Sequence, residues 1–236
     1  MGMVILFLLS HLQYILAAVV AYFCGCINGA ILTSKIFFRD DVRTHGSGNA
    51  GLTNFYRTYG ARYALLVIGC DMLKAAVAVG FAAWLGANFD PRIMPDVPLT
   101  AAQQAVFVLR FKYWAGLFCI IGHMFPCTAD FKGGKGILCG GTLMLLLDWR
   151  VALVGWGVFA ILWGATRYVS LGSVSAAVSF PISTYFVYHS IPETIIVSIT
   201  AALVIWAHRK NIVRLLNGTE SKFRFHVDRP KTEGEK

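Results

Sequence analysis

Residues 63–85 read Tyr-Ala-Leu-Leu-Val-Ile-Gly-Cys-Asp-Met-Leu-Lys-Ala-Ala-Val-Ala-Val-Gly-Phe-Ala-Ala-Trp-Leu, an apolar stretch broken by two charges, Asp71 and Lys74. About 20 apolar residues cross a bilayer as a helix, which satisfies every backbone polar group inside the membrane. The two charges are three positions apart, so they share one helix face and can pair. Charges inside a span mark a bundle-facing pair or a functional site, and here we favour a structural ion pair over direct catalysis.

The whole chain has the composition of a membrane protein. Of its 236 residues, 57% are hydrophobic and 14% are charged, whereas soluble domains carry about 25% charged residues. The apolar runs are too long, and alternate too little, for a membrane β-barrel. We therefore predict a single all-α membrane domain, residues 1–236, with seven transmembrane helices. The spans are predicted at residues 4–32, 63–85, 111–125, 136–147, 151–166, 169–188 and 194–207.

Two of the predicted spans are unusual in length, and one connection is rich in proline. The first span is longer than a bilayer requires, so we expect it to be tilted, kinked near Gly25 or partly outside the lipid. The fourth, at 136–147, is short and resembles a re-entrant segment. Residues 88–100 contain three prolines and are predicted to form a loop on the outer side.

The positive charges orient the predicted bundle. With the N-terminus outside, 16 Lys and Arg residues fall in the cytoplasmic segments and 4 on the opposite side. This asymmetry follows the positive-inside rule and places the polar tail, residues 209–236, in the cytoplasm. The net charge of +9 then indicates topology and attraction to anionic lipid. No basic face interleaved with aromatic residues supports nucleic-acid binding.

Two glycine-rich polar loops lie between the apolar segments. One is Phe131-Lys-Gly-Gly-Lys-Gly136, and the other runs from His45 to Asn54 and is followed by Arg57. Glycine leaves backbone N–H groups open and tolerates positive φ, so such loops can surround an anion, with lysine and arginine as counter-charges. The alternatives are a flexible, positively charged turn for the first loop and a capped turn before a helix for the second.

Three further polar features have simpler alternatives. The segment Arg167–Ser173 gathers a basic residue and two hydroxyls, although serines in helices often bond their own backbone. His208 and Asn211 would share a helix face, and a histidine there is usually a solvated interface residue. His123 is interpreted in the same way, as a cap of the third span. For the six cysteines, we favour small core residues over metal ligands or disulfides.

Several motifs, taken in order, resemble one family, the bacterial acyl-phosphate:glycerol-3-phosphate acyltransferases (PlsY). The likeness covers roughly residues 25–222. The matching segments are Gly46-Ser-Gly-Asn-Ala-Gly-Leu-Thr-Asn54 with Arg57, Asp71-Met-Leu-Lys74, Gly122-His-Met-Phe-Pro126 with Phe131–Gly136, Arg167–Ser173, and His208–Lys222. Linked motifs in a fixed order are far more specific than any single glycine loop.

The resemblance implies a fold, a reaction and a location. The fold is a seven-helix membrane enzyme with its N-terminus outside, in agreement with the independent charge count. The reaction moves a fatty acyl group from acyl phosphate to the 1-hydroxyl of glycerol 3-phosphate, which gives 1-acylglycerol 3-phosphate and phosphate, the first step of phospholipid biosynthesis. It implies no cofactor or metal, a site on the cytoplasmic side of the bacterial inner membrane, contact with membrane lipid and a functional link to a soluble enzyme that makes acyl phosphate.

Matched position by position, the resemblance also implies site residues. The catalytic residues are Ser47, Arg57 and Lys135. The substrate-binding residues are Asn49, Gly133, Gly134, Gly136, Ser173, His208 and Asn211, and the structural residues near the site are Asp71, Lys74 and Glu220. We expect Arg57 and Lys135 to neutralise phosphate and carbonyl charge, assisted by backbone N–H groups. His208 is a candidate base by its ordinary pKa, but the family is thought to use substrate phosphate, so we assign it to binding.

The chain also departs from the family pattern, and two other classes of protein are alternatives to this family. The departures are Leu52, Ile137-Leu-Cys139, Cys26-Ile-Asn28 and a longer outer stretch at 88–107. An anion transporter would suit the same loops, but the sequence has no inverted repeat. The His-x4-Asp pattern of other glycerolipid acyltransferases is absent from the sequence. The sequence therefore favours the acyl-phosphate enzyme.

Overall fold

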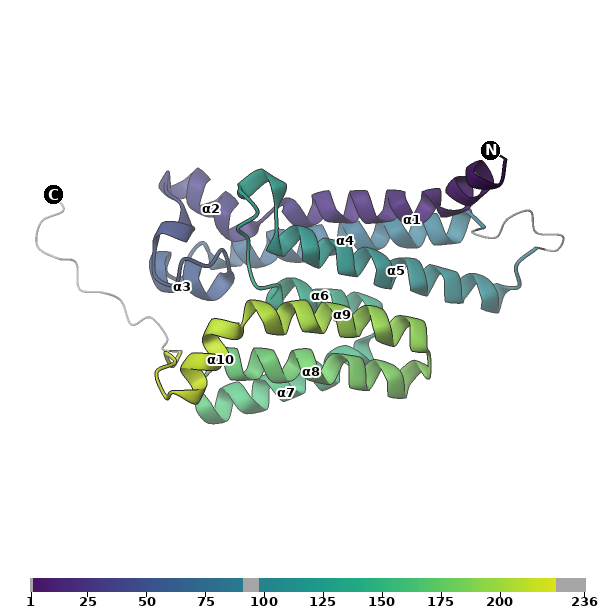
Figure 1. Cartoon of the computed structure of the whole chain (residues 1–236). Coiled ribbons are helices and arrows are strands. Elements are labelled where there is room, and N and C mark those ends of the chain that lie inside the picture. Colours follow the sequence, from purple (N-terminus) through teal and green to yellow (C-terminus); the bar gives the residue numbers. More distant parts are fainter. Residues whose placement is uncertain (1, 91–97, 224–236) are drawn as a thin grey trace, which may run out of the picture.

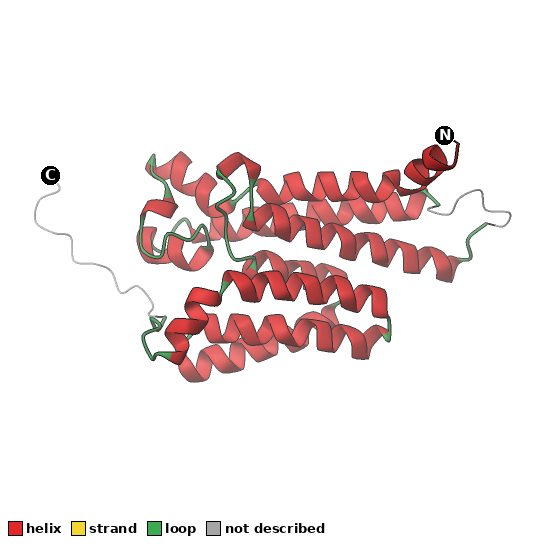
Figure 2. Ribbon diagram, viewed as in Figure 1, coloured by secondary structure: helices red, strands yellow, loops and turns green. Residues whose placement is uncertain are grey.

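The computed structural model describes the backbone of residues 2–90 and 98–223, with side chains from residue 11 onward. Within these ranges all regular structure is helical, as Figure 2 shows, so the predicted all-α fold is confirmed. The predicted tail beyond residue 223 and most of the predicted proline-rich loop lie outside the described residues. The elements are α1 Gly2–Cys26, α2 Gly29–Phe38, η1 Val42–Thr44, α3 Leu52–Tyr59, α4 Ala64–Asn88, α5 Ala101–Met124, η2 Cys127–Ala129, α6 Ile137–Leu147, α7 Trp149–Thr166, α8 Val169–Tyr188, α9 Ile191–Ala207 and α10 Arg209–Leu216.

Five helical segments of the described chain are long and apolar enough to cross a membrane: His11–Phe38, Ala64–Asn88, Ala101–Ala129, Trp149–Thr166 and Val169–Tyr188. A sixth is formed if α9 and α10, which meet at 59°, are taken as one bent span. The short helix α6 has 11 residues, about 16 Å, which is half of a bilayer core. The predicted short fourth segment is therefore present, while the total of seven spans and the outward N-terminus stay predictions.

The third span begins earlier than predicted. The sequence favoured residue 111, but α5 begins at Ala101. Thr100 accepts a hydrogen bond from the Gln103 backbone at 3.3 Å, and the Gln103 side chain accepts one from the Thr100 backbone at 3.0 Å, which forms a capping box. The glutamines of this first turn lower its hydropathy, so the hydropathy pattern does not show the start of the helix. Residues 101–107 of the predicted outer stretch 88–107 are therefore helical, and their place outside the membrane stays a prediction.

The long first span is broken between α1 and α2. The Asn28 side chain caps α2 by accepting hydrogen bonds from two backbone N–H groups of its first turn, at 3.0 and 3.1 Å. On the other side of the break, the Ile27 carbonyl accepts a hydrogen bond from Lys74 Nζ at 2.9 Å. Asp71 Oδ1 accepts one from the Gly29 N–H at 3.3 Å. The predicted kink is thus a full interruption, and the charge pair of α4 satisfies its exposed backbone groups.

Two layers of helices make up the bundle (Figure 1). Helices α1, α4 and α5 pack together in one layer, and α7, α8 and α9 form the other, with α6 in contact with α4, α5 and α7. Small residues let the first layer pack closely, since a Cβ on Gly25 or Gly122 would overlap backbone atoms of the facing helix. Helices α2, α3 and α10 lie at one end of the bundle, so the segments that carry most predicted site residues are gathered there.

Two cysteines give a direct test of this arrangement. Cys26 Sγ, at the end of α1, lies 3.8 Å from Cys127 Sγ in η2. Mild oxidation of the membrane-embedded protein with copper phenanthroline should therefore join Cys26 to Cys127, because a disulfide needs only a small approach of the two sulfurs. Peptides linked by the disulfide would be identified by mass spectrometry after pepsin digestion.

The control for this crosslink is a second cysteine pair at the same separation. Cys119 and Cys139 are also 3.8 Å apart, but both are fully buried, whereas Cys127 is exposed. They should react more slowly with the oxidant. A Cys26→Ser variant should lose the first crosslink only, and a crosslink of Cys127 to any other cysteine of the same chain would contradict the fold.

Candidate active site

A chain of hydrogen bonds starts at Lys135, just before α6. Lys135 Nζ donates to Asn211 Oδ1 at 2.5 Å, and Asn211 Nδ2 donates to Glu220 Oε1 at 2.7 Å. The three residues come from the glycine–lysine loop, from α10 and from the segment after α10. The structure therefore brings together three predicted site residues that are far apart in sequence. We call Lys135, Asn211, Glu220 and their hydrogen-bond partners the Lys135 cluster.

Glu220 is the anchor of this cluster. It also accepts hydrogen bonds from Ser170 Oγ in α8 and Arg214 Nε in α10, each at 2.7 Å. Its side chain is only 9% exposed. Burial alone would raise the pKa of Glu220, but the hydrogen bonds from Asn211, Ser170 and Arg214 outweigh it, so the pKa is lowered. Glu220 is thus a carboxylate at neutral pH and fastens α8, α10 and the following segment to one another.

Lys135 lies in an electrostatic setting suited to an anion. Burial lowers its pKa to about 8; Glu220 acts in the opposite direction, while the positive charges of Arg214 and Arg57 lower it further. The next residue, Gly136, precedes α6 and has φ 80°, and no side chain caps the helix. The first N–H groups of a helix attract negative charge. A phosphate placed here would stabilise the charged lysine and meet the helix terminus.

Arg57 closes the site from the side of α3. Its Nη2 donates to the Ser221 carbonyl at 3.4 Å, and the side chain is exposed. The neighbouring Tyr56 ring packs on Phe223, with centroids 5.4 Å apart, and the Phe223 N–H donates to the Arg167 carbonyl at 2.8 Å. The segment after α10 therefore passes between α3 and the corner of α7 and α8, and it brings Arg57 to the Lys135 cluster.

His208 and Ser173 are buried in the same end of the bundle, 3% and 1% exposed. His208 Nδ1 is 2.8 Å from the Val204 carbonyl, so this nitrogen carries the proton and Nε2 keeps a lone pair. His208 also lies within electrostatic reach of Lys135 and Glu220. Ser173 Oγ donates to the Val169 carbonyl at 2.8 Å, which is the back-bonding weighed as its alternative.

The two glycine loops meet at Gly134. A Cβ on this residue would overlap the His123 ring and come within 2.7 Å of the Ala50 carbonyl oxygen. The Gly133 N–H donates to the Met124 carbonyl at 3.0 Å, and the Gly134 N–H to the His123 carbonyl at 3.1 Å. The expectation that these two glycines offer free N–H donors is therefore wrong. They allow close packing, and the open donors begin at the start of α6.

The loop of Ser47 and Asn49 is held by Asn54. The Ser47 N–H donates to Asn54 Oδ1 at 3.0 Å, and Asn54 Nδ2 donates to two carbonyls of the preceding turn at 3.0 Å each. Ser47 is exposed and Asn49 half-buried. In the described part of the chain, no hydrogen bond joins either side chain to the Lys135 cluster. The structure places them in the adjoining loop, and their predicted roles stay predictions.

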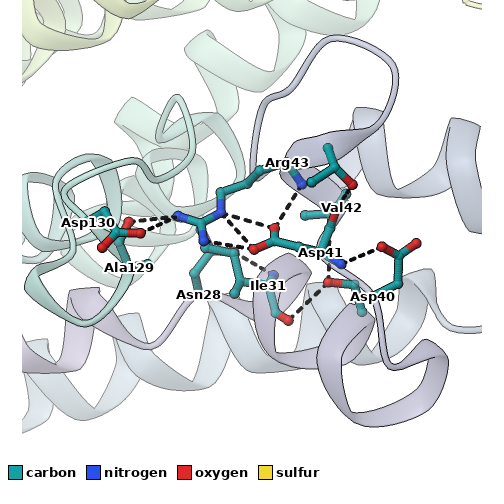
Figure 3. Close-up of polar contacts among 10 residues, drawn as sticks. Asn28, Ile31, Asp40, Asp41, Val42, Arg43, Ala129 and Asp130 are labelled. Carbon is teal, nitrogen blue, oxygen red and sulfur yellow. Dashed lines mark hydrogen bonds and ion pairs between the residues drawn. The ribbon is translucent and has the colours of Figure 1, made fainter.

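Arg43 links the connection after α2 to η2, and this contact was not predicted from the sequence. Its guanidinium pairs with Asp41, with Nη2 to Oδ2 at 2.7 Å, and Nη1 donates to the Ala129 carbonyl at 2.7 Å (Figure 3). Asp130 lies 3.8 Å from the same group. The Asp-x-Arg spacing was visible in the sequence, but its distant partner was not. This contact fastens the connection after α2 to η2.

The predicted ion pair between Asp71 and Lys74 is present, outside the Lys135 cluster. Lys74 Nζ lies 2.7 Å from Asp71 Oδ1 and 2.7 Å from His123 Nδ1, and all three residues are buried. The interpretation of His123 as an interface cap is therefore wrong. A buried ammonium needs several acceptors, and residue spacing does not indicate that a histidine 49 positions away supplies one.

An apolar groove of about 450 Å³ reaches toward this end of the bundle. It is lined by Phe125, Ile199, Ala202, Leu203 and Trp206, from the end of α5 and from α9. The neighbouring Val204 faces Gly136, since its side chain would lie 3.6 Å from a Cβ there. The groove therefore lies at the end of α5 and along α9, and the residue after its Leu203 faces the start of α6. Among the described residues, no three His, Cys, Asp or Glu side chains gather closely enough to hold a metal ion.

These features define a class of protein: a multi-pass helical membrane enzyme with a cationic site at one end of its bundle. Comparison with known proteins gives the family. The sequence matches the family "Glycerol-3-phosphate acyltransferase" over residues 15–218. The chain belongs to this family of acyltransferases.

Individual relatives agree with the family match. The chain is 38% identical over 205 residues to a glycerol-3-phosphate acyltransferase of Trichlorobacter lovleyi, covering 86% of this chain and 94% of that protein. It is 37% identical to one from Acaryochloris marina, covering 86% and 89%. It is also similar to the crystal structure of PlsY, an integral membrane glycerol 3-phosphate acyltransferase, in its glycerol 3-phosphate form, with a TM-score of 0.75, 29% identity and coverage of 89% and 96%. The lysophosphatidic acid form of the same protein gives 0.73, 28%, 89% and 95%.

The anchoring role of Glu220 can be measured as stability. Glu220→Ala removes the acceptor of three hydrogen bonds and leaves Arg214 unpaired, which should cost about 2 kcal/mol and lower the Tm by about 5 °C. Thermal unfolding of the detergent-solubilised protein would measure this change. The matched control is Asp130→Asn, because Asp130 is 82% exposed, its Oδ2 lies 3.8 Å from Arg43 Nη1, and asparagine tolerates the left-handed backbone of this position. The Tm of this variant should stay within about 2 °C of the wild type. Equal Tm values for the two variants would contradict the anchor.

Proposed function

We propose that this protein transfers a fatty acyl group from an acyl phosphate to the 1-hydroxyl of glycerol 3-phosphate, the first step of phospholipid biosynthesis. The products are 1-acylglycerol 3-phosphate and inorganic phosphate. The observation that carries the proposal is the half-buried Lys135, flanked by Arg57 and Arg214, at the uncapped start of α6. Both substrates are phosphates, and a site with this charge favours them.

The phosphate of glycerol 3-phosphate would lie between Lys135, Arg57 and the first turn of α6. Lysine supplies a compact charge, and arginine can hold two oxygens in parallel. The N–H groups after Gly136 would complete the site. Lys135 is already placed by its bond to Asn211, so little ordering is needed when the substrate binds.

The acceptor hydroxyl would lie next to His208. Because His208 Nδ1 is bonded to the Val204 carbonyl, the lone pair on Nε2 can accept a hydrogen bond from the substrate hydroxyl. The hydroxyl oxygen then attacks the acyl carbon, the bond from that carbon to the phosphate oxygen breaks, and the hydroxyl proton leaves with the phosphate. His208 serves in binding here, as do Asn211 and Ser173. An acyl phosphate is already activated, so orientation supplies much of the rate.

The acyl chain would occupy the apolar groove along α9. The groove is lined by aliphatic and aromatic side chains, and Val204, next to its Leu203, faces Gly136. A fatty acyl chain gains about 0.8 kcal/mol for each buried CH₂, so the groove would hold the tail of the donor and leave its acyl carbon beside the acceptor hydroxyl. The donor would thus enter from the membrane and the polar acceptor from the water.

The chain would be a single domain embedded in the bacterial inner membrane, with this site on the cytoplasmic side. The support is the distribution of basic residues, 16 against 4, with the majority on the side of the glycine loops. Acyl phosphate would come from a soluble enzyme on that side and reach the site through the lipid surface.

Purified protein should form 1-acylglycerol 3-phosphate from palmitoyl phosphate and glycerol 3-phosphate, with release of inorganic phosphate. Arg57→Ala and Lys135→Ala should each reduce the turnover at least 100-fold, because each removes a positive charge that would hold and orient the substrate phosphate. Mass spectrometry of the lipid product would measure the turnover, with Lys132→Ala, an exposed lysine of the same loop, as the matched control. Turnover with acyl-CoA alone would overturn the donor, and near-normal turnover of either site variant would overturn its role.

The pH dependence should reveal Lys135. Its pKa is lowered to about 8, so the fraction of charged lysine falls as the pH rises through 8, and the KM for glycerol 3-phosphate should rise above this pH. The substrate phosphate, with a second pKa of about 6, is already fully ionised there. Lys135→Arg keeps its charge at all these pH values and should remove the rise in KM. A wild-type KM that stays constant from pH 7 to pH 9.5 would contradict this role.

A further inference from the structure

We propose that His123 is a positioning residue for Lys135: the buried Lys74 fixes the hydrogen bonding of its ring, and the ring and backbone of His123 fix the course of the glycine–lysine loop. The inference rests on the proposed function for its kinetic readout. Neither Lys74 nor His123 touches the Lys135 cluster directly in the described structure. They act through Gly133 and Gly134.

Lys74 determines how the His123 ring is used. An ammonium has three N–H donors and no acceptor. Lys74 Nζ directs them to Asp71 Oδ1 at 2.7 Å, the Ile27 carbonyl at 2.9 Å and His123 Nδ1 at 2.7 Å. Since Lys74 can only donate, Nδ1 of His123 accepts, and the ring proton is on Nε2. Lys74 is 4% exposed and His123 is 3% exposed, so these bonds are shielded from solvent.

His123 then holds the glycine loop at two points. Its carbonyl accepts a hydrogen bond from the Gly134 N–H at 3.1 Å, and its ring edge lies against Gly134, where any Cβ would overlap Nε2. The adjoining Met124 carbonyl holds the Gly133 N–H at 3.0 Å. The last turn of α5 and the loop therefore form one unit.

This unit fixes the position of the Lys135 backbone. Lys135 follows Gly134 directly, and its Nζ bonds Asn211. On its other side, Gly134 touches the Ala50 carbonyl, which belongs to the loop of Ser47 and Asn49. A movement of the His123 ring therefore displaces the lysine and presses on the second loop. An error of about 1 Å in such a group can reduce the rate about 100-fold, so the ring matters although it touches no substrate.

Two substitutions separate the two contacts of the ring. In His123→Asn, the amide oxygen can take the place of Nδ1 and accept from Lys74, but the ring edge against Gly134 is lost. In His123→Gln, the amide reaches the place of Nε2 and keeps the loop contact, but Lys74 loses an acceptor. We expect His123→Asn to lower the Tm by less than His123→Gln does, because Lys74 keeps its acceptor, and to raise the KM for glycerol 3-phosphate at least tenfold. His123→Gln should do the reverse, with a lower Tm and a KM within twofold of the wild type.

A matched control comes from the same helix. Cys119 is fully buried in α5, one turn before His123, and its side chain contacts Cys139 instead of the loop. Cys119→Ala should lower the Tm without changing the KM. If His123→Asn leaves the KM unchanged, or if both His123 variants change the KM and the Tm together as one effect, the positioning role is overturned.

A second measurement is independent of catalysis. Acetic anhydride modifies uncharged lysines that reach solvent, and mass spectrometry gives the rate for each site. Lys135 of His123→Asn should react at least threefold faster than in the wild type, while Lys132, already exposed, should not change. An unchanged rate at Lys135 overturns the inference. An inactive wild-type enzyme with unequal labelling would instead overturn the proposed function alone.

Discussion

The structure depends on the burial of one charge, the ammonium of Lys74, inside an apolar bundle. Such a group is tolerated only when acceptors surround it. Asp71 and His123 supply two, the Gly25 carbonyl makes a longer contact at 3.4 Å, and the nearer backbone acceptor is the Ile27 carbonyl. An unbroken helix would use that carbonyl internally, so the interruption between α1 and α2 is what makes it available. The break and the buried lysine therefore require each other.

The buried charge of Lys74 affects how the candidate site is positioned through two parts of the chain. Along α2, the interruption redirects the chain toward the turn that carries Arg43, which then binds the Ala129 carbonyl. Along α5, the lysine holds His123 where the helix ends and the glycine loop starts. Both routes lead to the place where Gly134 meets Ala50. A charge pair that the sequence marked as structural is thus part of what positions the two loops.

Most of the fold was predictable because its signals are local. Apolar runs of bilayer length gave the helices, and a spacing of three residues gave the pair of Asp71 and Lys74. The start of α5 was missed, because a capping box of Thr100 and Gln103 is polar and looks like a loop in a hydropathy pattern. For the site, residue types and motif order indicated Lys135, Asn211 and Glu220 together. The use of the Gly133 and Gly134 N–H groups and the burial of His123 depend on contacts between distant segments, which residue spacing does not encode.

The hydrogen bonds of Glu220 also have a consequence for the order in which the protein is made and folds. Asn211, Arg214 and Glu220 follow every helix of the two layers in the chain, so the ribosome makes them after the bundle has begun to enter the membrane. Until they emerge, Lys135 lacks the amide that holds it, and α8 lacks the carboxylate that joins it to α10. A nascent or prematurely terminated chain would therefore reach the lipid without a complete Lys135 cluster. The cluster is completed only when the final segment folds back against α8 and α10.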